Sequence, residues 1–187
     1  MVRALAKFLF FVSGWRLGGK FPADVKKAVM VAAPHTSNWD LVYARAAFYL
    51  MGIPVRFTIK KEWIKGPMGW FLKKLGAIAI DRQKFKSADK RGSSVAAMIE
   101  LFDSREELVV LVTPEGTRKY AEKWKTGFYY VALGAKLPIV LGYLNYKEKV
   151  AGIGPAIQPT GDIEIDMEKI KDFYRKIPAK YPDQGVK

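Results

Sequence analysis

The chain contains a single histidine, His35, and an acidic residue, Asp40, follows it five positions later. A carboxylate that binds one imidazole nitrogen fixes the ring tautomer and stabilises the imidazolium that forms when the other nitrogen takes a proton. Such a pair is a general base for a hydroxyl group or a water molecule brought in as substrate. The alternative is a structural histidine with an acidic residue nearby.

A second polar cluster is the segment PEGTR, from Pro114 to Arg118. Gly116 lets the backbone approach a ligand closely, and the planar donor fork of Arg118 suits a phosphate group. Glu115 could orient Arg118 or accept a substrate hydroxyl, while Arg82 could supply a second cation. Two arginines beside a histidine base describe a site for a phosphorylated alcohol. The alternative is a surface turn and a solvated charge.

Short apolar runs alternate with longer amphipathic stretches along the chain, which favours strands alternating with helices. The predicted strands are Lys27–Ala33, Val55–Ile59, Ala77–Ile80, Glu107–Val112, Leu137–Tyr146 and Lys149–Gly154. The predicted helices run from Thr36–Asn38 to about Leu50, and over Met68–Leu75, Ser87–Phe102, Gly127–Lys136 and Met167–Ile177. This order predicts one α/β domain over residues 1–187, with a mostly parallel central sheet flanked by helices.

Three polar clusters follow predicted strands at their carboxyl ends: His35–Asp40, Asp81–Arg82 and Thr113–Arg118. The carboxyl ends of parallel strands meet at one edge of a sheet, where ligands of such folds bind. We therefore expect the three clusters to form a single cleft.

These blocks resemble the lysophospholipid acyltransferase family, which includes the 1-acylglycerol-3-phosphate acyltransferases. The H-x-x-x-x-D motif of that family is matched by His35 and Asp40, and its P-E-G-T-R motif by Pro114–Arg118. Its second block is matched by Gly76–Arg82, and its proline-bearing fourth block loosely by Leu137–Gly142. The similarity covers about Val29 to Leu144.

The resemblance implies an O-acyltransferase. The histidine would deprotonate the hydroxyl of a lysolipid acceptor, which attacks an acyl thioester of coenzyme A or acyl-carrier protein, with Asp40 supporting His35 and no acyl-enzyme. The residues that would bind the acceptor phosphate are Arg82, Glu115, Gly116, Thr117 and Arg118. Further candidates for binding the headgroup or the donor are Lys60, Lys61, Lys123 and Lys125. No cofactor is implied beyond the donor substrate.

The composition limits the other possibilities. Without cysteine there is no disulfide, cysteine nucleophile or thiolate metal site, and one histidine makes a zinc site untenable, so no metal is expected. The formal net charge of +14 favours polyanionic partners, such as an anionic membrane surface or an acidic carrier protein. We expect no nucleic-acid partner, because no recognition signature is present, although a basic nucleic-acid-binding module is an alternative. A thioesterase or phospholipase would use the same base on water.

The N-terminal stretch Ala4–Leu17 is apolar and aromatic but contains Lys7 and Arg16. It is too short and too charged to span a bilayer, and it lacks a signal-peptide cleavage site. Residues 1–20 are therefore expected to hold an amphipathic interfacial helix, with one face made of Leu5, Phe8, Leu9, Val12 and Trp15. The alternative is a helix packed on the core. We expect a peripheral or monotopic protein at the cytoplasmic face of the membrane, with a loose tail over residues 178–187.

Overall fold

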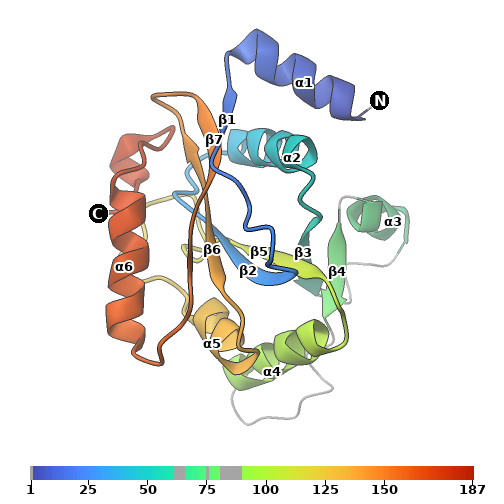
Figure 1. The fold of residues 1–187 in the computed structure, drawn as a ribbon, viewed down its shortest axis with the longest axis vertical. Helices are drawn as coiled ribbons and strands as arrows, with labels where there is room; N and C mark the ends of the chain where they lie inside the picture. The colour runs from blue at the N-terminus through green and yellow to red at the C-terminus, as the bar shows by residue number, and fades with distance from the viewer. Residues whose placement is uncertain (1, 61–65, 75, 81–89) are drawn as a thin grey trace.

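The computed structural model describes residues 2–60, 66–74, 76–80 and 90–187, and its centre is one seven-stranded sheet (Figure 1). The strands are β1 (Arg16–Gly18), β2 (Lys27–Ala32), β3 (Val55–Lys60), β4 (Ala77–Ile80), β5 (Leu108–Val112), β6 (Ile139–Asn145) and β7 (Val150–Ile157). They lie side by side in the order β1-β7-β6-β2-β5-β3-β4. All neighbouring pairs are parallel except β6 and β7, which are antiparallel. The predicted mostly parallel α/β fold is confirmed.

Helices cover both faces of this sheet (Figure 1). They are α1 (Val2–Ser13), α2 (Trp39–Met51), α3 (Gly66–Lys74), α4 (Lys90–Asp103), α5 (Gly127–Gly134) and α6 (Ile163–Arg175), with a 3-10 turn at Pro182–Gln184. Helices α4, α5 and α6 pack on one face, whereas α2 packs on the other and carries α1 on its outer side.

The central strands are apolar throughout because both of their faces are buried. In β2, Val29 and Val31 pack with α4, α5 and α6, while Ala28 and Met30 face the α2 side. All four side chains are fully buried. A continuous run of this kind is what the sequence shows at Lys27–Ala33, and the strand forms there.

Two parts of the sheet differ from the sequence prediction. The three-residue strand β1 was not predicted, and β7 extends to Ile157, three residues beyond the predicted end. Helix α6 also begins earlier than the predicted Met167. Asp162 caps it by accepting from the backbone N–H groups of Glu164 and Ile165, each at 3.1 Å, which fixes the start at Ile163.

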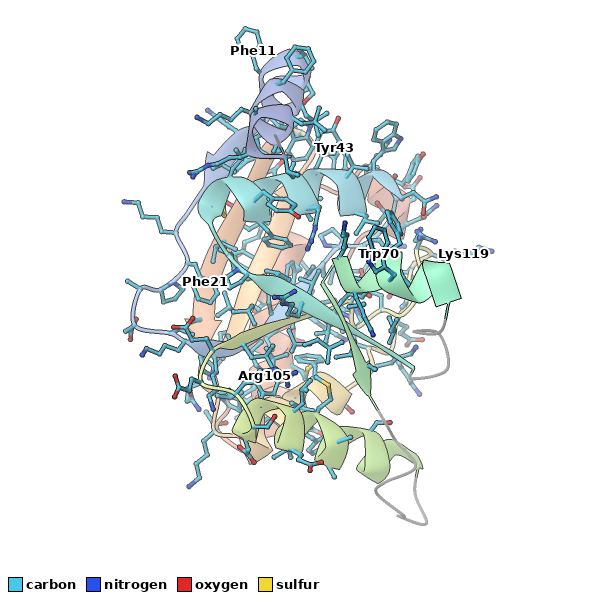
Figure 2. The ribbon with its side chains drawn as sticks, turned by 90° about the vertical axis from the view of Figure 1, so that its right-hand side faces the viewer. Phe11, Phe21, Tyr43, Trp70, Arg105 and Lys119 are labelled. Atoms are coloured by element: carbon cyan, nitrogen blue, oxygen red, sulfur yellow. The ribbon has the colours of Figure 1, made fainter. Side chains whose placement is uncertain are left out.

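Helix α1 presents two different faces. Its inner side buries Ala6 and Phe10 against α2, whereas Leu5, Phe8, Phe11 and Val12 are exposed on its outer side. Phe11 is 85% exposed and points away from the domain (Figure 2). The alternative of a helix packed on the core therefore describes the inner face, and the outer face is left exposed. No helix in the described part of the chain has the length and apolar character needed to cross a bilayer.

The predicted outer face of α1 needs two corrections. Trp15 does not share it, because the chain turns after Ser13 and Trp15 is buried, stacked on Tyr43 with ring centroids 4.3 Å apart. Leu9 is partly buried on the inner side.

The C-terminal segment also differs from the expected loose tail. Pro178 accepts a hydrogen bond from the backbone N–H of Tyr146 at 3.0 Å, and Ala179 is buried. Val186 packs against the main core cluster. Residues 178–187 therefore lie on the domain, held by apolar contacts and backbone hydrogen bonds.

Candidate active site

The loops after β2 and β5 are neighbours because of the register of the sheet. Val31 pairs with Val112 in adjacent parallel strands, so His35 and Glu115, which follow them, emerge at the same edge. Tyr174 of α6 also contacts this edge of the sheet, since its buried hydroxyl donates to the carbonyl oxygen of Val31 at 2.8 Å. Two of the three clusters expected to form one cleft, His35–Asp40 and Thr113–Arg118, therefore meet, whereas Asp81–Arg82 lies outside the described residues.

His35 and Asp40 form a direct pair. Nδ1 of His35 lies 3.0 Å from Oδ2 of Asp40. The imidazole is partly exposed and lines a cavity, whereas Asp40 is buried in the first turn of α2. Because Nδ1 faces the carboxylate, Nε2 is the nitrogen available to a substrate.

The carboxylate of Asp40 is held by several donors. Oδ2 also accepts from the backbone N–H groups of Thr36 and Ser37, each at 2.9 Å, and Oδ1 accepts from the hydroxyl of Tyr146 at 2.6 Å. Burial by itself would raise the pKa of Asp40, but the hydrogen bonds from His35, Tyr146 and Ser37 outweigh it and hold the pKa below its ordinary value. Asp40 is therefore an ionised partner that can stabilise an imidazolium.

Glu115 braces the histidine loop from the neighbouring strand. Its two carboxylate oxygens lie 3.0 and 3.2 Å from the backbone nitrogen of His35, which donates to them. Glu115 is only 7% exposed, and this burial raises its pKa to about 7 although the bond from His35 opposes the shift. The carboxylate of Glu115, which the sequence places among the phosphate-binding candidates, faces the backbone of the histidine loop.

A cavity of about 760 Å³ opens beside this pair. Its walls are mostly apolar and come from α2 and from the sheet, with Leu41, Ala44 and Phe48 on the helix side and Leu111 and Ile153 on the sheet side. Its volume and character suit a small organic ligand with an apolar part.

Cationic side chains line the same cavity. Arg118 and Lys125 both reach it from the segment that follows β5, next to Gly116. Gly116 has a φ of 64°, and a Cβ placed on it would lie 2.3 Å from Nζ of Lys125. The side chain of Lys125 therefore crosses directly over this glycine. Any larger residue at position 116 would push the lysine aside, and the backbone there would be strained.

The other predicted phosphate and donor residues are placed differently. Thr117 and Lys123 are exposed, and neither is among the described residues that line the cavity. The hydroxyl of Thr117 accepts instead from the backbone N–H of Lys119 at 3.2 Å. Lys60 ends strand β3, but its side chain lies outside the described part. Arg82 and Lys61 lie outside the described residues altogether.

Two residues of the site were missed from the sequence. Arg45 lines the cavity one helical turn after Leu41, and the i, i+4 spacing on the predicted helix was the signal that could have found it. Its guanidinium lies over the ring of Tyr49 at 4.9 Å. Tyr146 contacts Asp40 although it lies 106 residues away in the sequence, and no local sequence pattern indicates such a contact.

A mostly parallel sheet with a histidine–carboxylate pair beside an apolar, cation-lined cavity defines the class of this protein. A family model for the acyltransferases matches residues 16–141, and the chain belongs to that family. The resemblance seen in the sequence motifs is thereby confirmed.

Individual relatives are consistent with this assignment. The chain is 28% identical over 164 residues to a probable 1-acyl-sn-glycerol-3-phosphate acyltransferase of Mycoplasma pneumoniae, covering 80% of this chain but 59% of that protein. The crystal structure of the 1-acyl-sn-glycerophosphate acyltransferase of Thermotoga maritima has a similar fold, with a TM-score of 0.61 and 16% identity. That match covers 92% of this chain and 74% of the other.

Proposed function

We propose that this protein transfers a fatty acyl group from an acyl thioester to the hydroxyl of a lysophospholipid-like acceptor such as 1-acylglycerol-3-phosphate, a step of phospholipid synthesis. One observation carries this proposal: the imidazole of His35, bound to Asp40, lines an apolar cavity that Arg118 and Lys125 also line. This reaction requires a base, an apolar cavity for the acyl chain and cations for the phosphate.

The chemistry needs one base and no protein nucleophile. Nε2 of His35 takes the proton from the acceptor hydroxyl while its oxygen attacks the thioester carbonyl. The tetrahedral intermediate then collapses to an ester and expels the thiolate, which takes the proton back from the imidazolium. Asp40 stabilises the imidazolium between the two steps. The products are the acylated lipid and a free thiol.

The cations bind the acceptor phosphate in this proposal. Arg118 offers a fork of donors and Lys125 a compact charge; both line the cavity, and Lys125 crosses over Gly116. The family resemblance adds Arg82 to this set, with Lys60 and Lys61 as further candidates for the donor. The donor is acyl-coenzyme A or acyl-carrier protein, and the net charge of +14 favours either, since both are anionic.

The membrane is the proposed location of the acceptor. The outer face of α1 exposes Leu5, Phe8, Phe11 and Val12, with Arg3 and Lys7 on the same helix. Such a helix can lie in the headgroup region with its apolar side chains inserted, and basic residues favour the anionic cytoplasmic leaflet. Attachment is then peripheral or monotopic.

Mass spectrometry of lipids tests the activity. The protein is incubated with a mixture of lysolipids and an acyl thioester, and the His35→Ala variant is the control after its fold is checked by circular dichroism. We expect an acylated phospholipid from the wild type and none from the variant. Release of free fatty acid at the same rate with and without acceptor would show instead that the base acts on water.

Vesicle sedimentation tests the attachment. Replacing Phe8 and Phe11 by serine should weaken binding to anionic vesicles by roughly a hundredfold or more, since burying each phenylalanine is worth about 1.5–3 kcal/mol. The matched control is Phe10→Ser on the inner face of α1, which should lower stability. Unchanged partitioning of the outer-face variant would place the attachment elsewhere.

A further inference from the structure

Among the hydrogen bonds to the carboxylate of Asp40, the partner of the candidate base His35, the bond from Tyr146 is the shortest. It lies just after β6, in the turn that leads to β7, and its hydroxyl donates to Oδ1 of Asp40 at 2.6 Å. The other oxygen, Oδ2, faces Nδ1 of His35 and the N–H groups of Thr36 and Ser37. The two oxygens therefore have different hydrogen-bond partners, and Tyr146 is the partner of Oδ1.

The ring of Tyr146 is fixed without help from Asp40. Trp15 meets it edge to face, with centroids 5.0 Å apart, and Tyr43 lies at 6.3 Å in a similar geometry. The backbone N–H of Tyr146 donates to the carbonyl oxygen of Pro178 at 3.0 Å. A phenol held by packing on two sides is a rigid donor, so it can determine how the carboxylate of Asp40 is turned.

The phenol stays protonated throughout the useful pH range. Burial raises the pKa of Tyr146, and the hydrogen bond to Asp40 and the charge of that residue raise it further. Tyr146 therefore acts as a permanent donor and does not itself exchange a proton with a substrate.

We propose that Tyr146 is a positioning residue for the histidine base: its hydroxyl holds Oδ1 of Asp40 so that Oδ2 remains aligned with Nδ1 of His35. The effect on acyl transfer rests on the function proposed above, whereas the effect on the histidine itself does not. Without the hydroxyl, Thr36 and Ser37 still hold Oδ2 beside the imidazole, but the orientation of the carboxylate is less fixed. The carboxylate also loses a charge-assisted hydrogen bond, so the His35–Asp40 pair holds its proton to higher pH.

The single histidine allows a direct test. In Tyr146→Phe, the ring and its packing remain and only the hydroxyl is lost. Because no other imidazole is present, the ring signals of His35 in NMR spectra can be followed through a pH titration without ambiguity. We expect the midpoint of that titration to move up by about half to one pH unit, a shift within the reach of one hydrogen bond. The matched control is Tyr43→Phe, from the same aromatic cluster.

Kinetics provide the second measurement. In Tyr146→Phe, kcat should fall by roughly tenfold, the acid limb of its pH profile should move up with the NMR midpoint, and the KM values of donor and acceptor should change little. If the His35 titration and the kcat of Tyr146→Phe were like those of the wild type, Tyr146 would have a packing role only. If the midpoint moves but the wild type transfers no acyl group, the proposed function fails and the positioning role stands.

A second variant covers the case in which Tyr146→Phe does not fold. Replacement of Tyr146 by 3-fluorotyrosine keeps the size of the ring and makes the phenol a stronger acid and donor. The midpoint of the His35 titration should then move to lower pH, opposite to the effect of the phenylalanine. A shift in the same direction as the phenylalanine variant, or no shift, would contradict the proposal.

Discussion

The two sides of the cavity are built in different ways. On the histidine side, Asp40 is buried, both of its oxygens accept hydrogen bonds, and Glu115 holds the backbone of the loop. On the cationic side, Arg118 and Lys125 are exposed side chains of a surface segment. One side is fixed before a ligand binds, whereas the other is free to adjust to it.

This difference matches what each side has to do. Proton transfer from a hydroxyl needs a base at hydrogen-bonding distance and in a defined orientation, so rotational freedom of the imidazole lowers the rate directly. A cation attracts a phosphate over a wider range of positions, and long side chains close on it after it arrives. Substitutions on the two sides should therefore change different quantities.

The largest effect is expected on the fixed side, from Asp40→Asn. The asparagine oxygen can still accept from Thr36 and Ser37, but the negative charge opposite His35 is lost. We expect kcat to fall by roughly 10²–10⁴-fold, the range that general acid–base catalysis contributes. Steady-state kinetics would show this with nearly unchanged KM values. A loss of less than threefold would mean that the fixed geometry around Asp40 serves stability alone.

The next effect concerns Glu115 and is one of stability. Its pKa is about 7 in the folded protein, against 4.5 as its ordinary value. The folded state thus binds the proton more tightly, so stability falls as pH rises from about 4.5 to about 7, by roughly 3 kcal/mol in total. Glu115→Gln keeps an acceptor for the N–H of His35 and cannot ionise.

Urea unfolding at pH 5 and pH 8 measures this difference. The wild type should lose stability between the two pH values relative to Glu115→Gln, and the variant should be the more stable protein at pH 8. If the unfolding free energies of the two proteins changed with pH in parallel, ionisation of Glu115 would not destabilise the folded protein, and the prediction would be wrong.

The fixed side also shows how far the sequence alone could lead. His35 and Asp40 are five positions apart in a strand-to-helix connection, so local geometry brings them together and the pair could be predicted. Glu115 and Tyr146 join them from 80 and 106 residues away. Those contacts depend on the register of β2 with β5 and on the hairpin of β6 and β7, which residue patterns do not specify.

The same distinction holds for the fold. The buried run of β2 and the amphipathic helices follow from apolar periodicity, and they were predicted within a few residues. Strand β1 is three residues long with a partly exposed pattern, so it produces no periodic signal. The antiparallel direction of β7 arises from the short turn between Asn145 and Val150, since a parallel crossover needs a longer connection.

On the adjustable side, Arg118→Met should raise the KM of a phosphorylated acceptor by roughly tenfold, because a charge-assisted hydrogen bond is worth about 1.5–3 kcal/mol. Stability and kcat should change little, since the side chain is exposed. The matched control is Lys123→Met, a neighbouring exposed cation that does not line the cavity. Equal effects of the two variants would show that net charge matters and that position does not.

The smallest expected effect tests whether Lys125 and Gly116 act as one unit. Lys125→Met removes a flexible charge and should raise the acceptor KM by about threefold. Gly116→Ala should raise it by a similar factor, because a Cβ at this position displaces the lysine that crosses it. The double variant should then be no worse than either single one, since the second change removes an interaction already lost. Multiplied effects in the double variant would show that Gly116 contacts the acceptor independently of Lys125, and the cationic side would then be more fixed than its exposure indicates.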